Sequence, residues 1–364
     1  MKKYIFLYVL SSMTIWGAST IFADSEKKAT PENQELWSFS YFGQEDYFHR
    51  PSDMAYDTAR SLIYIADGGN NRILIFETNG QFVRAIGKKG QGPGEFSRPT
   101  GLCLMKDSRL AVADYGNNRI QIFGPEGEHD KVINTRELHV ADLLVIGKEI
   151  FTIPSYGISG YSLNMQLKEN SQPLVNVLDF EGNVVRTITT DAYPETHPFI
   201  RAIKHRVSMA FSPEGNLFLP FFAINNVSVF SPDGKKIEEF ERPIPFKPLF
   251  PELLRQTTSK DRIAMAAKVD MVNHSAHIGE DGHLYILTFV ESFDKLIKKR
   301  KKTEEMPPIP MRVDVLDSTS YKTLRSIEMD SNVRAFTPLE KNRLAYIYED
   351  AEGELVFKGI YLKQ

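Results

Sequence analysis

The stretch YIADGGNNRILIF, residues 64–76, decides the fold of this chain. Two apolar runs flank a polar cluster formed by Asp67, Asn70, Asn71 and Arg72. A second copy, AVADYGNNRIQIF, begins 47 residues further on and keeps the aspartate, both asparagines and the arginine. A polar cluster that recurs together with its flanking apolar runs indicates a structural repeat rather than a single active site.

Each copy belongs to a longer unit with four short apolar runs. Residues 50–87 and 98–133 both begin with Arg-Pro, and they align through the Ala-Asp pair, Asn-Asn-Arg-Ile and a run that ends in Phe. Asn79-Gly80 and Glu126-Gly127 then supply the turn before a fourth run. Short alternating runs between Gly, Asn and Asp turns are typical of antiparallel strands. Each unit therefore predicts a four-stranded meander.

Weaker copies of the unit continue to the end of the sequence. Together they predict six units that start near residues 51, 99, 138, 207, 273 and 333. The last unit has three strands, and the unassigned strand at residues 36–43 would supply the fourth. This pairing would close a ring and leave only short, protected strand edges. We predict an all-β fold, a six-bladed propeller of four-stranded antiparallel blades; seven blades is the alternative if an insertion hides one.

The first two units resemble the NHL-repeat family of β-propellers. The resemblance rests on the two copies and on GKKGQGPGEFSRPTGL, residues 87–102, which is similar to the linker between blades in that family. The match covers residues 43–125, about a quarter of the chain. It implies a propeller, but one propeller fold supports binding, lyase, hydrolase and scaffold roles.

The N-terminus has the pattern of a secretory signal peptide. Two lysines precede an apolar segment that ends in small residues, with cleavage preferred after Ala23 and Ser19 as the alternative. An uncleaved anchor over residues 4–22 is the competing interpretation, because that segment is nearly long enough to span a membrane. We expect residues 1–23 as signal, 24–35 as linker and 36–364 as one propeller domain. The product would be exported, periplasmic or extracellular, without a transmembrane segment after cleavage.

Net charge and cysteine content further limit the partners and the covalent cross-links that this protein can have. Without residues 1–23 the chain keeps 42 basic and 47 acidic residues, a net charge of −5. This balance argues against nucleic acid as a partner. Cys103 is the only cysteine, so no internal disulfide can form. Its apolar neighbours predict a buried side chain rather than a nucleophile.

Three segments interrupt the rhythm of the blades, at residues 155–172, 242–272 and 291–311. The second contains a pattern that predicts a helix over residues 251–270. The third combines the basic run 298–302 with Glu304 and Glu305, which predicts a solvated loop; phosphate or anionic lipid binding is the alternative. Insertions between second and third strands lie on the same face as the Asn-Asn-Arg corners, and loops on a rigid scaffold are frequent binding sites.

Ligand-binding groups of a propeller are expected where the first strands line a central channel. The repeat also resembles the peptidyl-α-hydroxyglycine α-amidating lyases, and that resemblance would imply a channel zinc held by histidines, one of them directly after the linker proline. Catalytic zinc needs about three protein ligands, but only one of the five matched positions is a histidine. These positions are Ser52, Thr100, Val207, His274 and Arg334, of which all but Val207 are channel ligand-binding candidates.

Two other ligand sets are incomplete in the sequence. His274 and His277 are three residues apart on a strand, so they would point to opposite faces. A calcium-dependent lactonase of the gluconolactonase kind would need a cluster of oxygen ligands. Asp53 and Asp142 are candidates for it, but no matched acidic set emerges across the blades. No cofactor is therefore expected, with a divalent metal as the alternative.

The sequence favours a non-catalytic binding or scaffold module. We expect a monomer that recognises a protein, peptide or glycan through its loop-bearing face; a metal-dependent lyase or hydrolase with its site in the channel is the alternative. The polar clusters are assigned to blade corners, where an aspartate bonds turn amides and an arginine pairs with it or with a neighbouring blade. The corner residues are Asp67, Asn71, Arg72, Asp114, Asn118 and Arg119.

Overall fold

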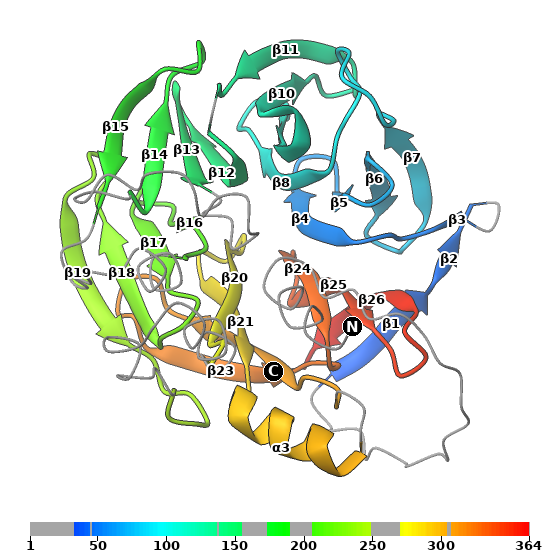
Figure 1. The fold of residues 1–364 in the computed structure, drawn as a ribbon, viewed down its shortest axis with the longest axis vertical. Coiled ribbons are helices and arrows are strands. Elements are labelled where there is room, and N and C mark those ends of the chain that lie inside the picture. The colour runs from blue at the N-terminus through cyan, green and yellow to red at the C-terminus, as the bar shows by residue number, and fades with distance from the viewer. Residues whose placement is uncertain are drawn as a thin grey trace.

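A computed structural model describes residues 33–43, 46–136, 138–154, 173–189, 206–248, 270–303 and 307–363. Within these ranges the strands form six four-stranded antiparallel sheets, arranged as blades around one axis (Figure 1), and one two-stranded hairpin. The six-bladed β-propeller expected from the repeats is confirmed.

Each blade runs from an innermost first strand to an outermost fourth strand. Blades one to three are β4 (Pro51–Asp57), β5 (Leu62–Asp67), β6 (Arg72–Glu77) and β7 (Phe82–Ile86); β8 (Pro99–Leu104), β9 (Leu110–Asp114), β10 (Arg119–Phe123) and β11 (His129–Asn134); β12 (Val140–Ile146), β13 (Glu149–Pro154), β14 (Val175–Leu178) and β15 (Val184–Ile188). Blades four to six are β16 (Ala210–Phe211), β17 (Leu217–Pro220), β18 (Asn226–Phe230) and β19 (Lys236–Glu241); β20 (Asn273–Ile278), β21 (Leu284–Phe289), β22 (Met311–Leu316) and β23 (Thr323–Glu328); β24 (Val333–Leu339), β25 (Arg343–Glu349), β26 (Leu355–Leu362) and β1 (Asn33–Phe39).

The N-terminal strand closes the ring, as predicted. β1 pairs antiparallel with β26 and becomes the outermost strand of blade six. Trp37 packs against the cluster that joins Phe357 of blade six to Phe76 of blade one, and its Nε1 donates to the carbonyl oxygen of Thr78 at 3.0 Å. The closing strand begins at Asn33 rather than at residue 36. The remainder of the predicted strand forms β2 (Tyr41–Phe42), which pairs with β3 (Asp46–Tyr47).

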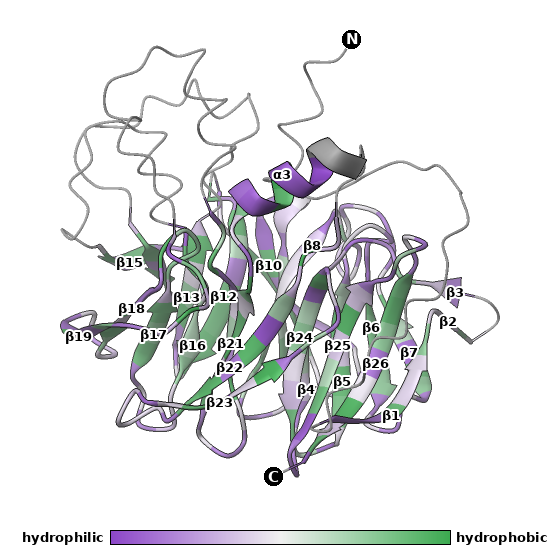
Figure 2. Ribbon diagram, turned by 90° about the horizontal axis from the view of Figure 1, so that it is seen from below, coloured by the Kyte–Doolittle hydropathy of each residue, from purple (hydrophilic) through white to green (hydrophobic). Residues whose placement is uncertain are grey.

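Apolar side chains pack between neighbouring blades, and the strands carry many hydrophobic residues (Figure 2). One cluster combines Tyr64 and Ile73 of blade one with Leu102 and Val112 of blade two. Cys103 belongs to the next cluster and is buried as a free thiol, as the sequence predicted. Burial of this kind stabilises a closed ring by roughly 25 cal/mol per Å² of apolar surface, without a disulfide.

One face of the ring carries the ends of the second strands and the starts of the first and third strands; we call it the corner face. The first residue of β4 pairs with the last residue of β5, and the last residue of β5 pairs with the first of β6. The same arrangement holds in blade two. The 3-10 turn η2 (Tyr115–Asn117) belongs to this face.

A helix replaces part of the solvated loop predicted for residues 291–311. α3 (Phe293–Thr303) connects β21 to β22 and lies over the corner face (Figure 2). Phe293 and Leu296 are buried in the cluster that contains Met311, and the N–H of Phe293 donates to Oδ1 of Asp270 at 2.6 Å. The loop prediction was wrong here because the basic composition obscured an apolar spacing of three residues, which is helical.

Two exposed lysines of α3 are paired locally. Lys298 Nζ lies 2.6 Å from Asp294 Oδ2, and Lys299 Nζ lies 2.7 Å from Glu291 Oε2. The expected neutralisers Glu304 and Glu305, the insertion at 155–172 and the helix predicted over 251–270, Asp270 apart, lie outside the described residues. Among the described residues, no helix has the length and apolarity needed to cross a membrane.

Candidate functional site at the propeller axis

A β-bulge opens the innermost strand of five blades. The pairing register shifts by one residue between the first and third positions of β4, β8, β12, β20 and β24. A bulge leaves one residue unpaired and redirects its side chain. The unpaired residues, which we call the first layer, are Ser52, Thr100, Ala141, His274 and Arg334. They lie at the corner-face end of the axis.

Blade four differs from the other five. Val207 bridges Phe221, and Ser208 donates its N–H to the carbonyl oxygen of Pro220, so the register continues without a shift. Val207 is buried and apolar. The residue before it, Arg206, is exposed and sits at the start of this blade. Four of the five positions matched in the sequence, all except Val207, therefore lie in the first layer. The fifth first-layer residue is Ala141, which the sequence alignment did not assign.

Two first-layer hydroxyls connect successive blades. Ser52 Oγ donates to the carbonyl oxygen of Pro99 at 3.1 Å, and Thr100 Oγ1 donates to that of Val140 at 3.3 Å. Pro99 and Val140 open the innermost strands of the following blades. Both hydroxyls therefore have a structural role: that of Ser52 joins blade one to blade two, and that of Thr100 joins blade two to blade three.

Blades four to six each start with a basic residue at the same end of the axis, Arg206, His274 and Arg334. Burial, followed by the charges of Arg206 and Arg334, lowers the pKa of His274 to about 3. The imidazole is therefore neutral at ordinary pH, and Arg334 forms an ion pair with Glu349. Burial alone lowers the pKa of His277 to about 4, and its ring meets that of Phe336 edge-on at 4.7 Å. His277 is thus packed against an apolar neighbour.

Two carboxylates lie on the other side of the axis, one residue further along their strands than the first layer. Asp53 Oδ2 accepts the N–H of Leu102 at 2.7 Å. Asp142 approaches Gly101 so closely that a Cβ on that glycine would lie 3.0 Å from Oδ1 of the aspartate. Burial raises the pKa of Asp142 to about 6. Burial, and then the Asp142 charge, raises the pKa of Asp53.

These donors do not fit a zinc or calcium site on their own. Calcium takes six to eight oxygen ligands, and catalytic zinc takes about three protein ligands. Asp53 and Asp142 supply two carboxylates. Among the described residues no group of three or more His, Cys, Asp or Glu side chains has a metal-holding arrangement. We therefore derive no catalytic step through a metal.

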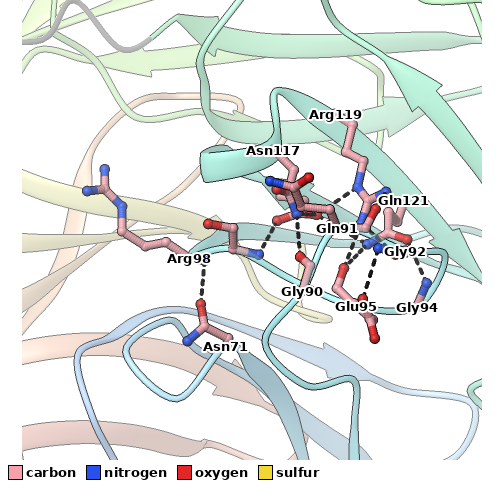
Figure 3. A network of polar contacts seen from close by, with 12 residues as sticks. Asn71, Gly90, Gln91, Gly92, Gly94, Glu95, Arg98, Asn117, Arg119 and Gln121 are labelled. Atoms are coloured by element: carbon pink, nitrogen blue, oxygen red, sulfur yellow. Dashed lines mark hydrogen bonds and ion pairs between the residues drawn. The ribbon is translucent and has the colours of Figure 1, made fainter.

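The blade corners hold the segments that connect the blades. In blade two, Arg119 Nε lies 2.8 Å from Asp114 Oδ2, and its NH groups donate to the carbonyl oxygens of Gln91, Gly92 and Glu95 (Figure 3). These three carbonyls belong to the linker between blades one and two. Arg119 thus fastens that linker to the corner.

Blade one repeats the arrangement with a different connector. Arg72 Nε lies 2.9 Å from Asp67 Oδ2, and the arginine also pairs with Asp46 in the β2–β3 hairpin. Asn71 Oδ1 accepts the N–H of Arg98 at 2.8 Å, which joins this corner to the next linker (Figure 3). At both corners these contacts join the blade to its connecting segments, so the corner side chains have a structural role.

Comparison with known proteins agrees with this architecture. A family described as a 6-bladed beta-propeller (DUF5128) matches residues 54–197. A member of the DUF4221 family from Bacteroides vulgatus superposes with a TM-score of 0.60 at 14% identity, covering 92% of this chain and 99% of that chain. A Bacteroides fragilis protein, provisionally described as exported, superposes with a TM-score of 0.58 at 10% identity, covering 93% and 98%. A gluconolactonase from Xanthomonas campestris gives 0.54 at 14% identity, covering 90% and 89%. Such likenesses establish the class, a six-bladed β-propeller, and the fold alone.

Two features of the axis were missed by sequence reasoning. Arg206 precedes residue 207, where its unit was predicted to start, so no repeat position pointed to it. The closeness of Asp53 and Asp142 was hidden because the third unit was started at residue 138, whereas β12 starts at Val140. Counting from Val140 would have placed Asp142 at the position of Asp53.

Proposed function

We propose that the protein is a non-catalytic binding module that takes a protein, peptide or glycan on the corner face, at the end of the axis. The observation that supports this most is the ring of bulged residues, which brings side chains from successive blades to one place. His274 and Arg334 come from adjacent blades, and Arg206 stands at the start of the blade before them. A closed ring with fastened corners holds such groups in fixed positions, which lowers the entropy cost of binding.

A variant with a bulky side chain at the corner-face end of the axis tests this function. Purified protein and the variant Ala141→Trp would be screened on glycan and peptide arrays, with hits measured by calorimetry. Ala141 is a first-layer residue without a polar contact of its own, so the indole should obstruct ligand with little loss of stability. Val83→Trp on the exposed outer strand of blade one is the matched control. Ligand that binds Ala141→Trp as tightly as the wild type would place the site elsewhere.

A metal-dependent lyase or hydrolase at the axis is the second candidate. The pair of carboxylates at Asp53 and Asp142 is the observation in its favour. Metal analysis of protein purified without chelator separates the two candidates. Stoichiometric, tightly bound zinc or calcium that is lost in Asp142→Asn, or a changed mass of the bound ligand after incubation, would favour the enzyme over the binding module.

A further inference from the structure

We propose that the corner face binds an acidic glycan, whose carboxylate groups are held by Arg98 and Arg50 beside the axis. This inference rests on the proposed binding function and names the chemistry of the ligand. Both arginines directly precede the innermost strand of their blade, β8 and β4, at positions that the repeat makes equivalent. Both side chains are exposed, so a ligand on this face can reach them.

Arg98 lies on an aromatic stack that joins blade two to blade three. Its Cζ atom lies 4.1 Å from the centre of the Tyr115 ring, and the centres of the Tyr115 and His139 rings are 5.5 Å apart. Tyr115 belongs to η2, and His139 directly precedes β12. A guanidinium on the face of a ring is held in one plane. Its N–H donors are therefore oriented before a ligand arrives, which lowers the entropy cost of binding.

The same contact recurs in blade four. The Cζ atom of Arg206 lies 4.2 Å from the centre of the Phe222 ring. Phe222, like Tyr115, comes directly after the residue that pairs with the first position of the innermost strand. An arginine stacked on the aromatic residue that follows the corner is therefore a repeated arrangement on this face, and not a single chance contact.

The guanidinium of Arg98 keeps its donors for a ligand. Within the described ranges it packs on Tyr115 and forms no ion pair or hydrogen bond, whereas Arg119 of the same corner is bonded to Asp114 and to the linker carbonyls. Figure 3 shows the Arg98 guanidinium directed away from those contacts. The side chain of Arg50 likewise has neither kind of contact in the part of the chain that the structure describes.

The backbone at both positions favours residues other than arginine. Arg50 and Arg98 have φ of 52° and 54°, a left-handed conformation that asparagine and glycine adopt more readily. Asn332 occupies the equivalent position in blade six with φ of 58°, and its Oδ1 accepts the N–H of Ile309 at 2.9 Å. The arginines therefore contribute what an asparagine would not, which is exposed positive charge.

An acidic glycan fits these two arginines better than an acidic peptide. A guanidinium donates two parallel N–H bonds to one carboxylate. A Cβ on Gly68 would lie 3.3 Å from the carbonyl oxygen of Arg50 and 2.8 Å from that of Pro99, so the two strand starts meet there and present the same donor twice. A uronate chain also repeats its carboxylate on each sugar of a stiff backbone, whereas glutamate side chains lose rotamer freedom on binding.

The test uses acidic probes and their neutral counterparts. Tetragalacturonic acid would be titrated calorimetrically beside its full methyl ester, and an N-acetylated tetraglutamate peptide beside the tetraglutamine peptide. We expect the uronate to bind the wild type and its ester to bind at least about tenfold more weakly, because charged hydrogen bonds are lost. Tighter binding of the acidic peptide than of the uronate would overturn the glycan assignment, and no binding of either acid would overturn the inference.

Three variants separate recognition from structure. Arg98→Asn should weaken the uronate about tenfold or more while the melting temperature stays the same or rises, because asparagine relaxes the backbone. Arg50→Asn should weaken it by a similar factor. Lys106→Gln removes one positive charge from the exposed turn at the opposite end of blade two and should change nothing.

Several outcomes would overturn the assignment. These are uronate binding that survives Arg98→Asn or Arg50→Asn, an equal loss in Lys106→Gln, and a lower melting temperature of Arg98→Asn with unchanged affinity in the folded fraction. If only neutral ligands bind the wild type and Ala141→Trp abolishes their binding, the proposed function stands while the acidic glycan fails.

Discussion

The corners of blades one and two and the junction of blades four and five fasten connecting segments in opposite ways. At the corners, the blade supplies an aspartate and an arginine, and the connector supplies mainly backbone carbonyls. At the junction, the connector supplies the arginine: Arg242 follows β19 and reaches Asp314 and Thr288 of blade five. The position of Asp67 is taken in blade four by the buried Phe221, so an acidic corner is absent there.

The corners and the junction differ in how deeply their charged side chains are buried. The arginines of the corners keep contact with water, with exposed side-chain fractions of 17% and 10%, whereas Arg242 and Asp314 have 0% and 1%. Asp314 also accepts from Ser326 Oγ at 2.5 Å and from Thr288 Oγ1 at 3.1 Å, and it forms a second ion pair with Arg312, whose Nε lies 2.8 Å from Oδ1. A fully buried ion pair adds little net stability compared with apolar residues in its place. A buried charge that has lost its partner, however, is strongly unfavourable. The junction should therefore be the more fragile region under single substitution.

Breaking the junction should give the largest effect on stability. We expect Arg242→Met to lower the free energy of unfolding by about 3–5 kcal/mol, because Asp314 keeps only Arg312 as a guanidinium partner and the buried Oδ1 of Asn273 loses its donor. Urea denaturation measures the change. The double variant Arg242→Met/Asp314→Leu should recover part of it but not all, because Arg312 then loses its acidic partner. A single-variant loss below about 1 kcal/mol would show that the buried pair is not the feature that holds this junction.

Breaking a corner should cost less. Asp67 accepts the N–H of His49 at 2.7 Å and donors from Asn70 and Arg72 at 2.9 Å. We expect Asp67→Ala to lower the free energy of unfolding by about 2–3 kcal/mol, with ligand affinity in the folded fraction little changed. The exposed aspartate Asp107 provides a control, with an expected effect near zero for Asp107→Ala. A large affinity loss at unchanged melting temperature would contradict the structural role assigned to the corner.

The same comparison explains what the sequence could predict. A corner spans six consecutive residues, from Asp67 to Arg72, and it recurs, so one sequence is enough to detect it. The junction joins Arg242 to Asp314, residues 72 positions apart, and does not recur in the other blades over the part of the chain that the structure describes. Blade number and ring closure follow from the repeat for the same reason as the corner. The bulges in the innermost strands could not be predicted in this way, because a bulge shifts the pairing register by one residue and has no characteristic amino-acid composition.

The acidic side of the axis gives a pH-dependent effect of intermediate size. The folded pKa of Asp142, about 6, lies above the ordinary value of an aspartate, about 3.9. The protonated form is therefore favoured by folding, so its contribution is fully present below about pH 4 and is lost as the pH rises through 6. We expect the wild type to lose about 2 kcal/mol of stability across this window relative to Asp142→Asn.

Thermal unfolding between pH 4 and pH 7.5 measures this difference. Because Asp53 also has a raised pKa and neighbours Asp142, the variant Asp53→Asn should flatten the same part of the profile. Asp46→Asn serves as a control of opposite sign: its hydrogen bond from Arg72 lowers the pKa of that carboxyl. An unchanged slope in Asp142→Asn would show that this carboxylate is solvated like an ordinary surface aspartate.

The smallest effect distinguishes the two corners from each other. Asn71 and Asn118 occupy the same place in their corners, and both have a left-handed backbone, with φ of 57° and 49°. Asn71 Oδ1 accepts the N–H of Arg98, whereas Asn118 Oδ1 is buried without a hydrogen-bond partner among the described residues. Glycine adopts this conformation without strain. We therefore expect Asn71→Gly to cost about 1 kcal/mol and Asn118→Gly to be neutral or slightly stabilising, because it removes an unsatisfied acceptor. Equal losses in urea denaturation would mean that the backbone conformation, and not the link to the next blade, governs both positions.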